Sequence, residues 1–520
     1  MALVSHRFVR YGRQLPPELE EARVSIVELA KSYGLDFFDT IFEMCSYEEI
    51  NMIASYGGFP TRYPHWRFGM EFLQMQKSYE FGLSKIYEMV INTDPSYAYL
   101  MDCNLIVDQK LVMAHVLGHV DFFKNNLWFA HTNRRMLDEV ANHATKVRQI
   151  MNRHGATEVE QFIDLCLSID NLTDPYSDHI TRDRSVSEQE LEAAELDPGV
   201  GRIKSRSYMD KHINPPEFLK AQREKRLAEL NKMRSFPESP QRDVMQFLVK
   251  HAPRRNWQRE ILSIIREEAV YFAPQGLTKI MNEGWATYWH TKLMTRHILT
   301  DAEVIDFCDH NAGTLQTAPG QLNPYKLGVE LWRHIEERWD KGRFGKEWME
   351  CKDPAVRASW DRETMQGREK IFQVRKTHND ITFVDTFLTE DFCREQGFFA
   401  THYDKRREEW IIDSREFLEV KSNLLSMLAS RGTPRISVVD ANHSNRGELL
   451  LLHEHEGFDI QLDWAQTVLQ NISLLWGRPV VLETVVDQKS LRLFHDGTEL
   501  TREEIKEQED SRDEPEDTPV

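Results

Sequence analysis

Apolar side chains recur with a helical period along most of the first 180 residues. Between Pro16 and Gly34 they return every three or four positions, and the glycine at the end is typical of a helix C-cap. The same pattern predicts a helix that ends at Tyr56. Three later helices are predicted over residues 69–91, 111–128 and 132–154. The N-terminal part of the chain is therefore expected to be helical.

Helical periodicity returns after residue 243 and gives way to a strand pattern beyond about residue 375. Helices are predicted over residues 257–272, 277–294, 302–310 and 325–341. In the later part, apolar positions alternate or run together between turn residues, which is typical of strands. Strands are predicted over residues 381–388, 435–440, 448–453 and 479–486, with a helix over 463–475 among them.

Amino-acid composition predicts which remaining segments lie outside the folded domains. Arg, Lys, Glu, Asp and Ser dominate residues 181–245, which predicts a linker or insertion, and the acidic end predicts a disordered tail. The expected fold is mainly α, with a smaller α+β C-terminal domain. Its expected parts are a helical core in two pieces (1–180 and 246–374), the charged linker (181–245), the C-terminal domain (375–500) and the tail (501–520).

Charge and cysteine usage restrict the class of partner and the compartment. The 520 residues carry a net charge of −19, which argues against nucleic acid or an anionic membrane surface as the main partner. Nowhere do 18 apolar residues follow one another, so no membrane insertion is expected. The six cysteines form no Cys-x-x-Cys motif and are expected to be small buried side chains. These features predict a soluble protein of the reducing cytoplasm.

The segment from His115 to His119 carries the most informative chemistry. Two histidines four positions apart share one face of a helix, which is how His-Glu-x-x-His zinc peptidases hold their metal. Val116 stands where those enzymes carry their catalytic glutamate. Taken alone, the pair is also compatible with two buried histidines that only form hydrogen bonds.

Glu283 is a candidate third ligand. In zincins that use a glutamate as third ligand, this residue sits on a later helix, and a small residue after it lets two helices approach. Glu283 and Ala286 fit this pattern, and His290 lies two turns further along the same face. The alternative is that Glu283 forms an ion pair with a neighbouring Arg or Lys, because an isolated buried carboxylate is costly.

Two histidines and one glutamate form the ligand set of a catalytic zinc centre with an open position for water. Glu267, Glu268 or His290 could act as the base that Val116 does not provide, and His310 could be a further ligand. Glu267 and Glu268 could equally be a solvated acidic pair. The same residue types also suit a non-haem iron or di-metal carboxylate site, but the Glu-x-x-His spacing of that class is not clearly present.

Three segments carry a family resemblance: AHVLGHVDFFKNN (114–126), MNEGWATYWH (281–290) and LNPYKLG (322–328). They resemble the hallmark blocks of the SpoVR-like (stage V sporulation protein R) family, and the resemblance spans roughly residues 16 to 495. It implies a role in spore cortex formation or stress physiology. It also implies a PrkA-type serine protein kinase and a von Willebrand-like protein as partners. The valine at position 116 is, by this resemblance, a trait of the family.

Two hypotheses follow. The first is a zincin-like helical core that holds a divalent metal, zinc, through His115, His119 and Glu283, for metal-assisted hydrolysis. The second is a non-catalytic regulator or scaffold, in which the same residues form a structural metal site or a buried polar network. The missing base favours the second hypothesis, and the open two-His-one-Glu set favours the first.

Overall fold

The computed structural model describes residues 12–80, 88–180, 236–317, 321–404, 407, 409–430, 433–457 and 459–505, together with residues 215, 217, 218, 220 and 222. Contacts between Cα atoms group the chain into two compact units. The first unit comprises residues 1–160 and 271–431, and the second comprises residues 161–270 and 432–520. Each unit is thus assembled from two separate segments of the chain.

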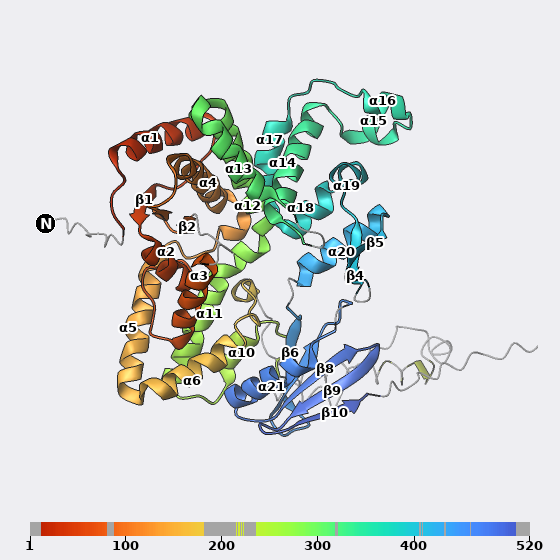
Figure 1. Cartoon of the computed structure of the whole chain (residues 1–520). Coiled ribbons are helices and arrows are strands. Elements are labelled where there is room, and N and C mark those ends of the chain that lie inside the picture. The colour runs from red at the N-terminus through yellow and green to blue at the C-terminus, as the bar shows by residue number, and fades with distance from the viewer. Residues whose placement is uncertain are drawn as a thin grey trace, which may run out of the picture. The chain divides into compact units, whose positions relative to one another are not determined.

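Three helices form the centre of the first unit (Figure 1). α12 (Lys279–Leu293) packs against both α4 (Ile106–Asn125) and α14 (Pro324–Asp340). Side chains of α4 and α12 are buried around most of the helix circumference, which is typical of helices in the core of a large protein. Between α12 and α14, the rings of Trp285 and Trp332 meet edge to face at 5.0 Å.

Glycine lets these three helices approach closely. A Cβ atom at Gly118 of α4 would lie 2.7 Å from the Cα atom of Ala286 on α12. A Cβ atom at Gly284 of α12 would lie 2.4 Å from the Cα atom of Gly328 on α14. Larger side chains would push the helices apart, because interiors are close-packed. The small residue predicted after Glu283 does lie against a partner helix.

A three-stranded sheet interrupts the predicted run of N-terminal helices. β1 (Thr40–Cys45) pairs in parallel with β3 (Ser96–Met101), and β2 (Glu88–Ile91) pairs with β3 in the antiparallel direction. The prediction of helices throughout this part, including one that reaches residue 91, was wrong here. β3 is buried at every position and β1 at four, so neither strand shows the alternation that marks a half-buried strand.

Most of the other predicted helices of the first unit are confirmed with shifted ends. Its further helices are α1 (Pro17–Ser32), α2 (Tyr47–Ser55), α3 (Trp66–Glu80), α5 (Met136–His154), α13 (Val304–Leu315), α15 (Gly345–Glu350), α16 (Pro354–Ala358), α17 (Gly367–Thr377), α18 (Asp380–Phe387), α19 (Glu390–Gln396) and α20 (Phe417–Ser430). A hairpin of β4 (Ala400–Asp404) and β5 (Glu409–Ser414), the 3-10 helices η1 (Leu127–Phe129) and η4 (Asp301–Glu303) and the π-helix η3 (Met294–Ile298) complete it.

The segment predicted as a strand over residues 381–388 is a helix, α18, so that prediction was wrong. Asn379 and Thr382 form a capping box that satisfies backbone groups at the start of the helix. The ring of Phe383 packs 4.6 Å from that of Trp332 on α14. Capping and tertiary packing thus override the β-branched composition that suggested a strand.

The second unit contains a five-stranded sheet with the order β10-β9-β8-β7-β6. Neighbouring strands are antiparallel except β7 and β8, which are parallel and are connected through α21. The strands and helix predicted over residues 435–440, 448–453, 463–475 and 479–486 are confirmed. The elements are β6 (Ile436–His443), β7 (Glu448–His453), α21 (Leu462–Trp476), β8 (Val480–Val486), β9 (Lys489–His495), β10 (Leu500–Glu504), α10 (Val244–His251) and η2 (Ser177–His179).

α6 (Ala156–Leu167) and α11 (Asn256–Leu277) each contain residues of both units. The predicted linker over residues 181–245 lies largely outside the described residues, and so does the predicted tail beyond Ile505. The first residues of that predicted tail belong to β10. No helix in the described part of the chain is both long enough and apolar enough to cross a membrane.

Candidate metal centre

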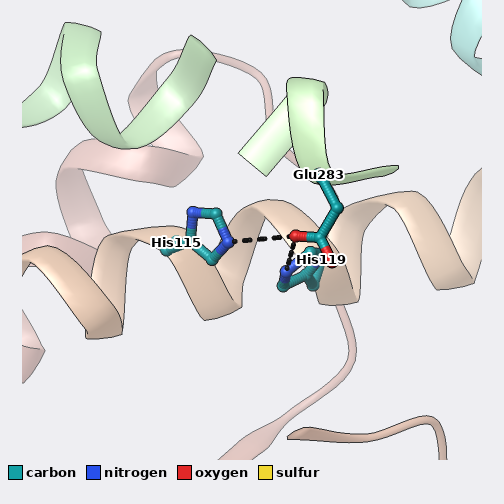
Figure 2. A group of neighbouring side chains, drawn as sticks. All are labelled: His115, His119 and Glu283. Carbon is teal, nitrogen blue, oxygen red and sulfur yellow. Dashed lines mark ion pairs between the residues drawn. The ribbon is translucent and has the colours of Figure 1, made fainter. Parts of the chain in front are cut away.

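α4 and α12 bring three side chains of metal-ligating type together (Figure 2). His115 and His119 lie one turn apart on α4, and Glu283 reaches them from α12. Glu283 Oε2 lies 3.4 Å from His119 Nε2 and 3.6 Å from His115 Nε2. Ligand atoms of all three residues lie within 4.8 Å of one another. Both histidines are buried, and Glu283 is partly exposed.

These separations fit a divalent metal with tetrahedral ligands. Zn–N and Zn–O bonds of about 2.0–2.1 Å at tetrahedral angles place neighbouring ligand atoms about 3.4 Å apart. The observed 3.4 and 3.6 Å are long for hydrogen bonds. The buried Oε2 atom of Glu283 accepts no hydrogen bond from any described residue. A metal ion would satisfy that oxygen.

A hydrogen bond fixes the orientation of His119. Its Nδ1 atom lies 2.9 Å from the Oδ1 atom of Asn282, which can only accept. The Nδ1–H of His119 therefore donates to this amide, and Nε2 keeps its lone pair toward Glu283. Metal-bound histidines commonly donate their second ring N–H to such a partner. Asn282 and Glu283 are consecutive residues of α12, and they thus supply the hydrogen-bond acceptor of His119 and the carboxylate of the candidate site.

A chain of hydrogen bonds orients His115. His290 Nε2 lies 3.3 Å from Asn311 Oδ1, and His290 Nδ1 lies 2.8 Å from His115 Nδ1. Because the amide oxygen accepts, the proton of a neutral His290 is on Nε2, and its Nδ1 accepts from the Nδ1–H of His115. His115 Nε2 is left with a lone pair on the side of Glu283.

The electrostatics favour an ionised Glu283 and a neutral His290. Burial alone would raise the pKa of Glu283, but His119 and His115 outweigh it and hold this pKa below its ordinary value. Burial, with His115 nearby, lowers the pKa of His290 well below its ordinary value. Metal ligation needs an ionised carboxylate and neutral imidazoles. Among the described residues, Glu283 forms its ion pairs with the two histidines, and no Lys or Arg pairs with it.

Family comparisons cover nearly the whole chain. A family model described as SpoVR like protein matches residues 14–433, and one described as SpoVR-like C-terminal domain matches residues 434–487. The chain belongs to the SpoVR family. An uncharacterised protein of Escherichia coli (strain K12), YcgB, is 30% identical over 504 residues, which cover 90% of this chain and 92% of that protein. No solved structure matches.

In this SpoVR-family chain, the residue at position 116 is part of the hydrophobic core. All three candidate ligands lie within the range of the longer family match. The side chain of Val116 is fully buried in the hydrophobic core of the first unit, among apolar residues of α4 and α12. The position that carries glutamate in His-Glu-x-x-His enzymes therefore provides no proton acceptor here.

None of the other predicted site residues belongs to the group formed by His115, His119 and Glu283. His310 lies on α13, where its Nδ1 atom is 2.9 Å from Asp108 Oδ1, and it is not in the group of clustered ligand atoms. His290 contacts His115 directly, as a partner of a candidate ligand. Glu267 and Glu268 lie on α11, in the part of it that belongs to the second unit, and their role as a base stays a prediction.

A pocket of about 380 Å³ opens beside Glu283. Its described lining is mostly polar and includes Lys279, Thr314, Gln316, Gln321 and Tyr325. The ring of Tyr325 stacks on that of His115, with 6.2 Å between the centroids. Sequence analysis predicted neither this pocket nor the hydrogen bond of Asn282. Asn282 and several lining residues of the pocket do lie in or beside the family-like segments 281–290 and 322–328, which could have pointed to them.

A buried ion pair holds α4 in place next to the candidate ligands. Asp121 lies two positions after His119, and its two carboxylate oxygens each lie 2.5 Å from Nη1 of Arg375 on α17. Asp121 also accepts hydrogen bonds from Trp285 Nε1 at 2.8 Å and from the backbone N–H of Asp36 at 2.7 Å. Asp121 therefore positions the helix and is not a ligand.

Proposed function

We propose that this SpoVR-family protein is a metal-dependent hydrolase with a zincin-like centre, in which His115, His119 and Glu283 hold a zinc ion. The observation that carries the proposal is the convergence of two imidazole Nε2 atoms on one carboxylate, at 3.4 and 3.6 Å. The hydrogen bonds at Nδ1 of both histidines support it. Three protein ligands leave a fourth position for water or substrate.

A bound zinc ion would supply Lewis-acid activation of water or of a substrate carbonyl. The chain's own residues would bind the substrate and move its protons. In the pocket beside Glu283, Lys279 would contact an anionic group, and Gln316 and Gln321 would form hydrogen bonds. His290 is poorly placed to act as a base because both of its ring nitrogens are hydrogen-bonded. Glu267 and Glu268 stay the sequence-based candidates.

The cellular setting is proposed from the family resemblance. It comprises spore cortex formation or stress physiology in the cytoplasm. The proposed partners are a PrkA-type serine protein kinase and a von Willebrand-like protein.

A second candidate function is that of a non-catalytic regulator or scaffold that acts with these partners. The burial of Val116 favours it, because the chain lacks a proton acceptor at the usual place. In this case the metal would hold α4 and α12 together without chemistry, as structural zinc sites do.

Metal analysis of the purified full-length protein tests the metal site. We expect close to one equivalent of zinc in the wild type and its loss in a His115→Ala/His119→Ala variant. His131→Ala is the matched control, because this histidine is exposed and lies outside the site. A metal-free wild type after growth and purification in zinc-containing medium would refute the site.

A complementation experiment separates catalyst from scaffold. Glu283→Gln keeps the shape of the side chain but removes its charge, so function in the cell is expected to fail while the protein remains folded and binds its partners. Lys279→Gln, in the same pocket, would lower activity without loss of zinc. Full function of Glu283→Gln would rule out catalysis at this site and leave the scaffold.

A further inference from the structure

A second pocket of the first unit contains no residue of the candidate metal centre. Residues of α14, α15, α16 and α19 and of the adjoining loops surround about 920 Å³. This volume lies within the range of small-molecule sites, roughly 300–1,000 Å³. α15 and α16 come after α14 in the chain and project from it in Figure 1. We call this the α14–α19 pocket.

Three of the four carboxylates of the α14–α19 pocket form an ion pair, and two of these three share one arginine. Lys341 lies 2.5 Å from Glu337. Arg394 lies 2.6 Å from Glu390 and 3.8 Å from Asp391. Among the described residues, Glu395 is the lining carboxylate that forms no ion pair. Four carboxylates and two cations leave this side of the pocket with a net charge of −2, which the four other cations of the lining exceed.

Four cations of the lining form no ion pair with a described carboxylate: Arg338, Arg343, Lys352 and Arg357. Arg343 still acts by charge on Glu337, whose pKa is lowered by Lys341 and additionally by Arg343. Arg338 Nε donates to the backbone oxygen of Arg343 at 2.9 Å, and Arg343 Nε donates to that of Trp360 at 3.2 Å. Each of these two guanidinium groups is thus fixed by one hydrogen bond from its Nε atom to a backbone oxygen. Their Nη groups form no hydrogen bond with any described residue.

An aromatic wall lies beside these cations. The guanidinium carbon of Arg357 lies 4.3 Å from the centroid of the Trp348 ring, which is a cation–π distance. Trp348 in turn meets Trp360 edge to face at 5.4 Å. Arg357 is therefore held against an aromatic ring by one face, and its N–H groups remain available for a ligand.

The guanidinium groups of Arg338 and Arg357 lie close enough to repel each other. Burial, with Arg357 close by, lowers the pKa of Arg338. Arg338, Arg343 and Arg357 are all partly buried, in a chain with a net charge of −19. A bound anion would relieve this repulsion. Guanidinium groups bind phosphate oxygens in pairs, and several of them match the two or more charges of a phosphoryl group better than a single carboxylate does.

We propose that the α14–α19 pocket binds a small molecule that carries a diphosphate group, with Arg338, Arg343 and Arg357 as its hydrogen-bond donors. This site does not depend on the metal centre or on the proposed hydrolysis. Its ligand would be either a free oligophosphate or a nucleoside diphosphate, which share the same anionic group.

Calorimetric titration of the full-length protein with inorganic pyrophosphate and with ADP tests the proposal. We expect one saturable site per chain for at least one probe, and weaker binding at higher salt. The probe that binds more tightly identifies the source of the diphosphate. Arg357→Gln should raise its Kd about tenfold or more, because it removes charge-assisted hydrogen bonds. Arg357 forms no hydrogen bond through its side chain in the described structure, so the variant is expected to fold.

The matched control is Arg362→Gln. Arg362 is a neighbouring cation that is paired with Glu347 at 2.7 Å and does not line the pocket. The titrations are repeated with His119→Ala and with a chelator, so that a phosphate bound to a metal ion is not mistaken for this site. Absence of binding by both probes at millimolar concentration would overturn the proposal. So would equal effects of the Arg357 and Arg362 variants, or binding that disappears with the metal.

Discussion

Asn282 and Asn311 determine which ring nitrogen of each candidate ligand faces Glu283. Asn282 accepts from His119 directly, and Asn311 acts on His115 through His290. Neither amide is part of the His-x-x-x-His motif. A metal site with this arrangement depends on uncharged partners that hold the imidazoles in one tautomer.

Loss of the amide at position 282 should weaken zinc binding without unfolding the protein. Asn282→Ala leaves the Nδ1–H of His119 without its acceptor, and we expect zinc affinity to fall about 10–100-fold. A competition titration with a chromophoric chelator measures this. Asn282→Asp retains an acceptor and should keep most of the affinity. Equal zinc affinity in the alanine variant and the wild type would show that the amide does not orient a ligand.

His334 predicts a pH dependence of stability. Burial, reinforced by Arg338, lowers the pKa of His334 from 6.5 to about 4. The unfolded chain therefore binds a proton on this residue before the folded chain does, and stability is lost as pH falls from about 6.5 toward 4. Over this window the wild type should lose up to about 3 kcal/mol more than His334→Gln. Urea unfolding of both proteins at several pH values measures the difference, and parallel curves would contradict the prediction.

The candidate metal centre is built on the helices α4 and α12, and α12 in turn crosses α14. Gly284 follows Glu283 directly and lies against Gly328, with no room for a side chain. Gly284→Ala should therefore separate α12 from α14, lower stability by about 3 kcal/mol and weaken zinc binding. The control is Gly69→Ala in α3, where nothing lies within 4 Å, and it should be neutral or stabilising by about 0.5–1 kcal/mol. Equal unfolding midpoints for the two variants would contradict this account.

Hydrophobic periodicity and turn residues correctly predicted those helices and strands that are determined by neighbouring residues in the sequence. The helices around His115 and Glu283 and three strands of the second unit follow from periodicity and turn residues. β3 was missed because burial on both faces removes alternation, and α18 was mistaken for a strand because its capping and its contact with Trp332 are tertiary. The pairing of His290 with His115 could not be predicted, since it joins residues 175 positions apart.

Over the whole molecule, the candidate metal centre joins two distant segments of one unit. His119 and its partner Asn282 are separated by 163 positions, and residues 161–270 between them belong to the second unit. Closing so long a loop costs conformational entropy. A metal shared by α4 and α12 would offset part of this cost, because it binds the folded unit and not the unfolded chain.

Zinc should therefore protect the first unit selectively. At a free zinc concentration about 100 times the Kd, the gain in unfolding free energy is about 2.7 kcal/mol. Hydrogen exchange measured by mass spectrometry, with zinc or with chelator, should show slower exchange in α4 and α12 and little change in β6 to β10. His119→Ala should abolish the difference, since it removes a candidate ligand. Protection that spreads evenly over both units, or that persists in this variant, would mean that zinc binds elsewhere and that the two helices are held together by packing alone.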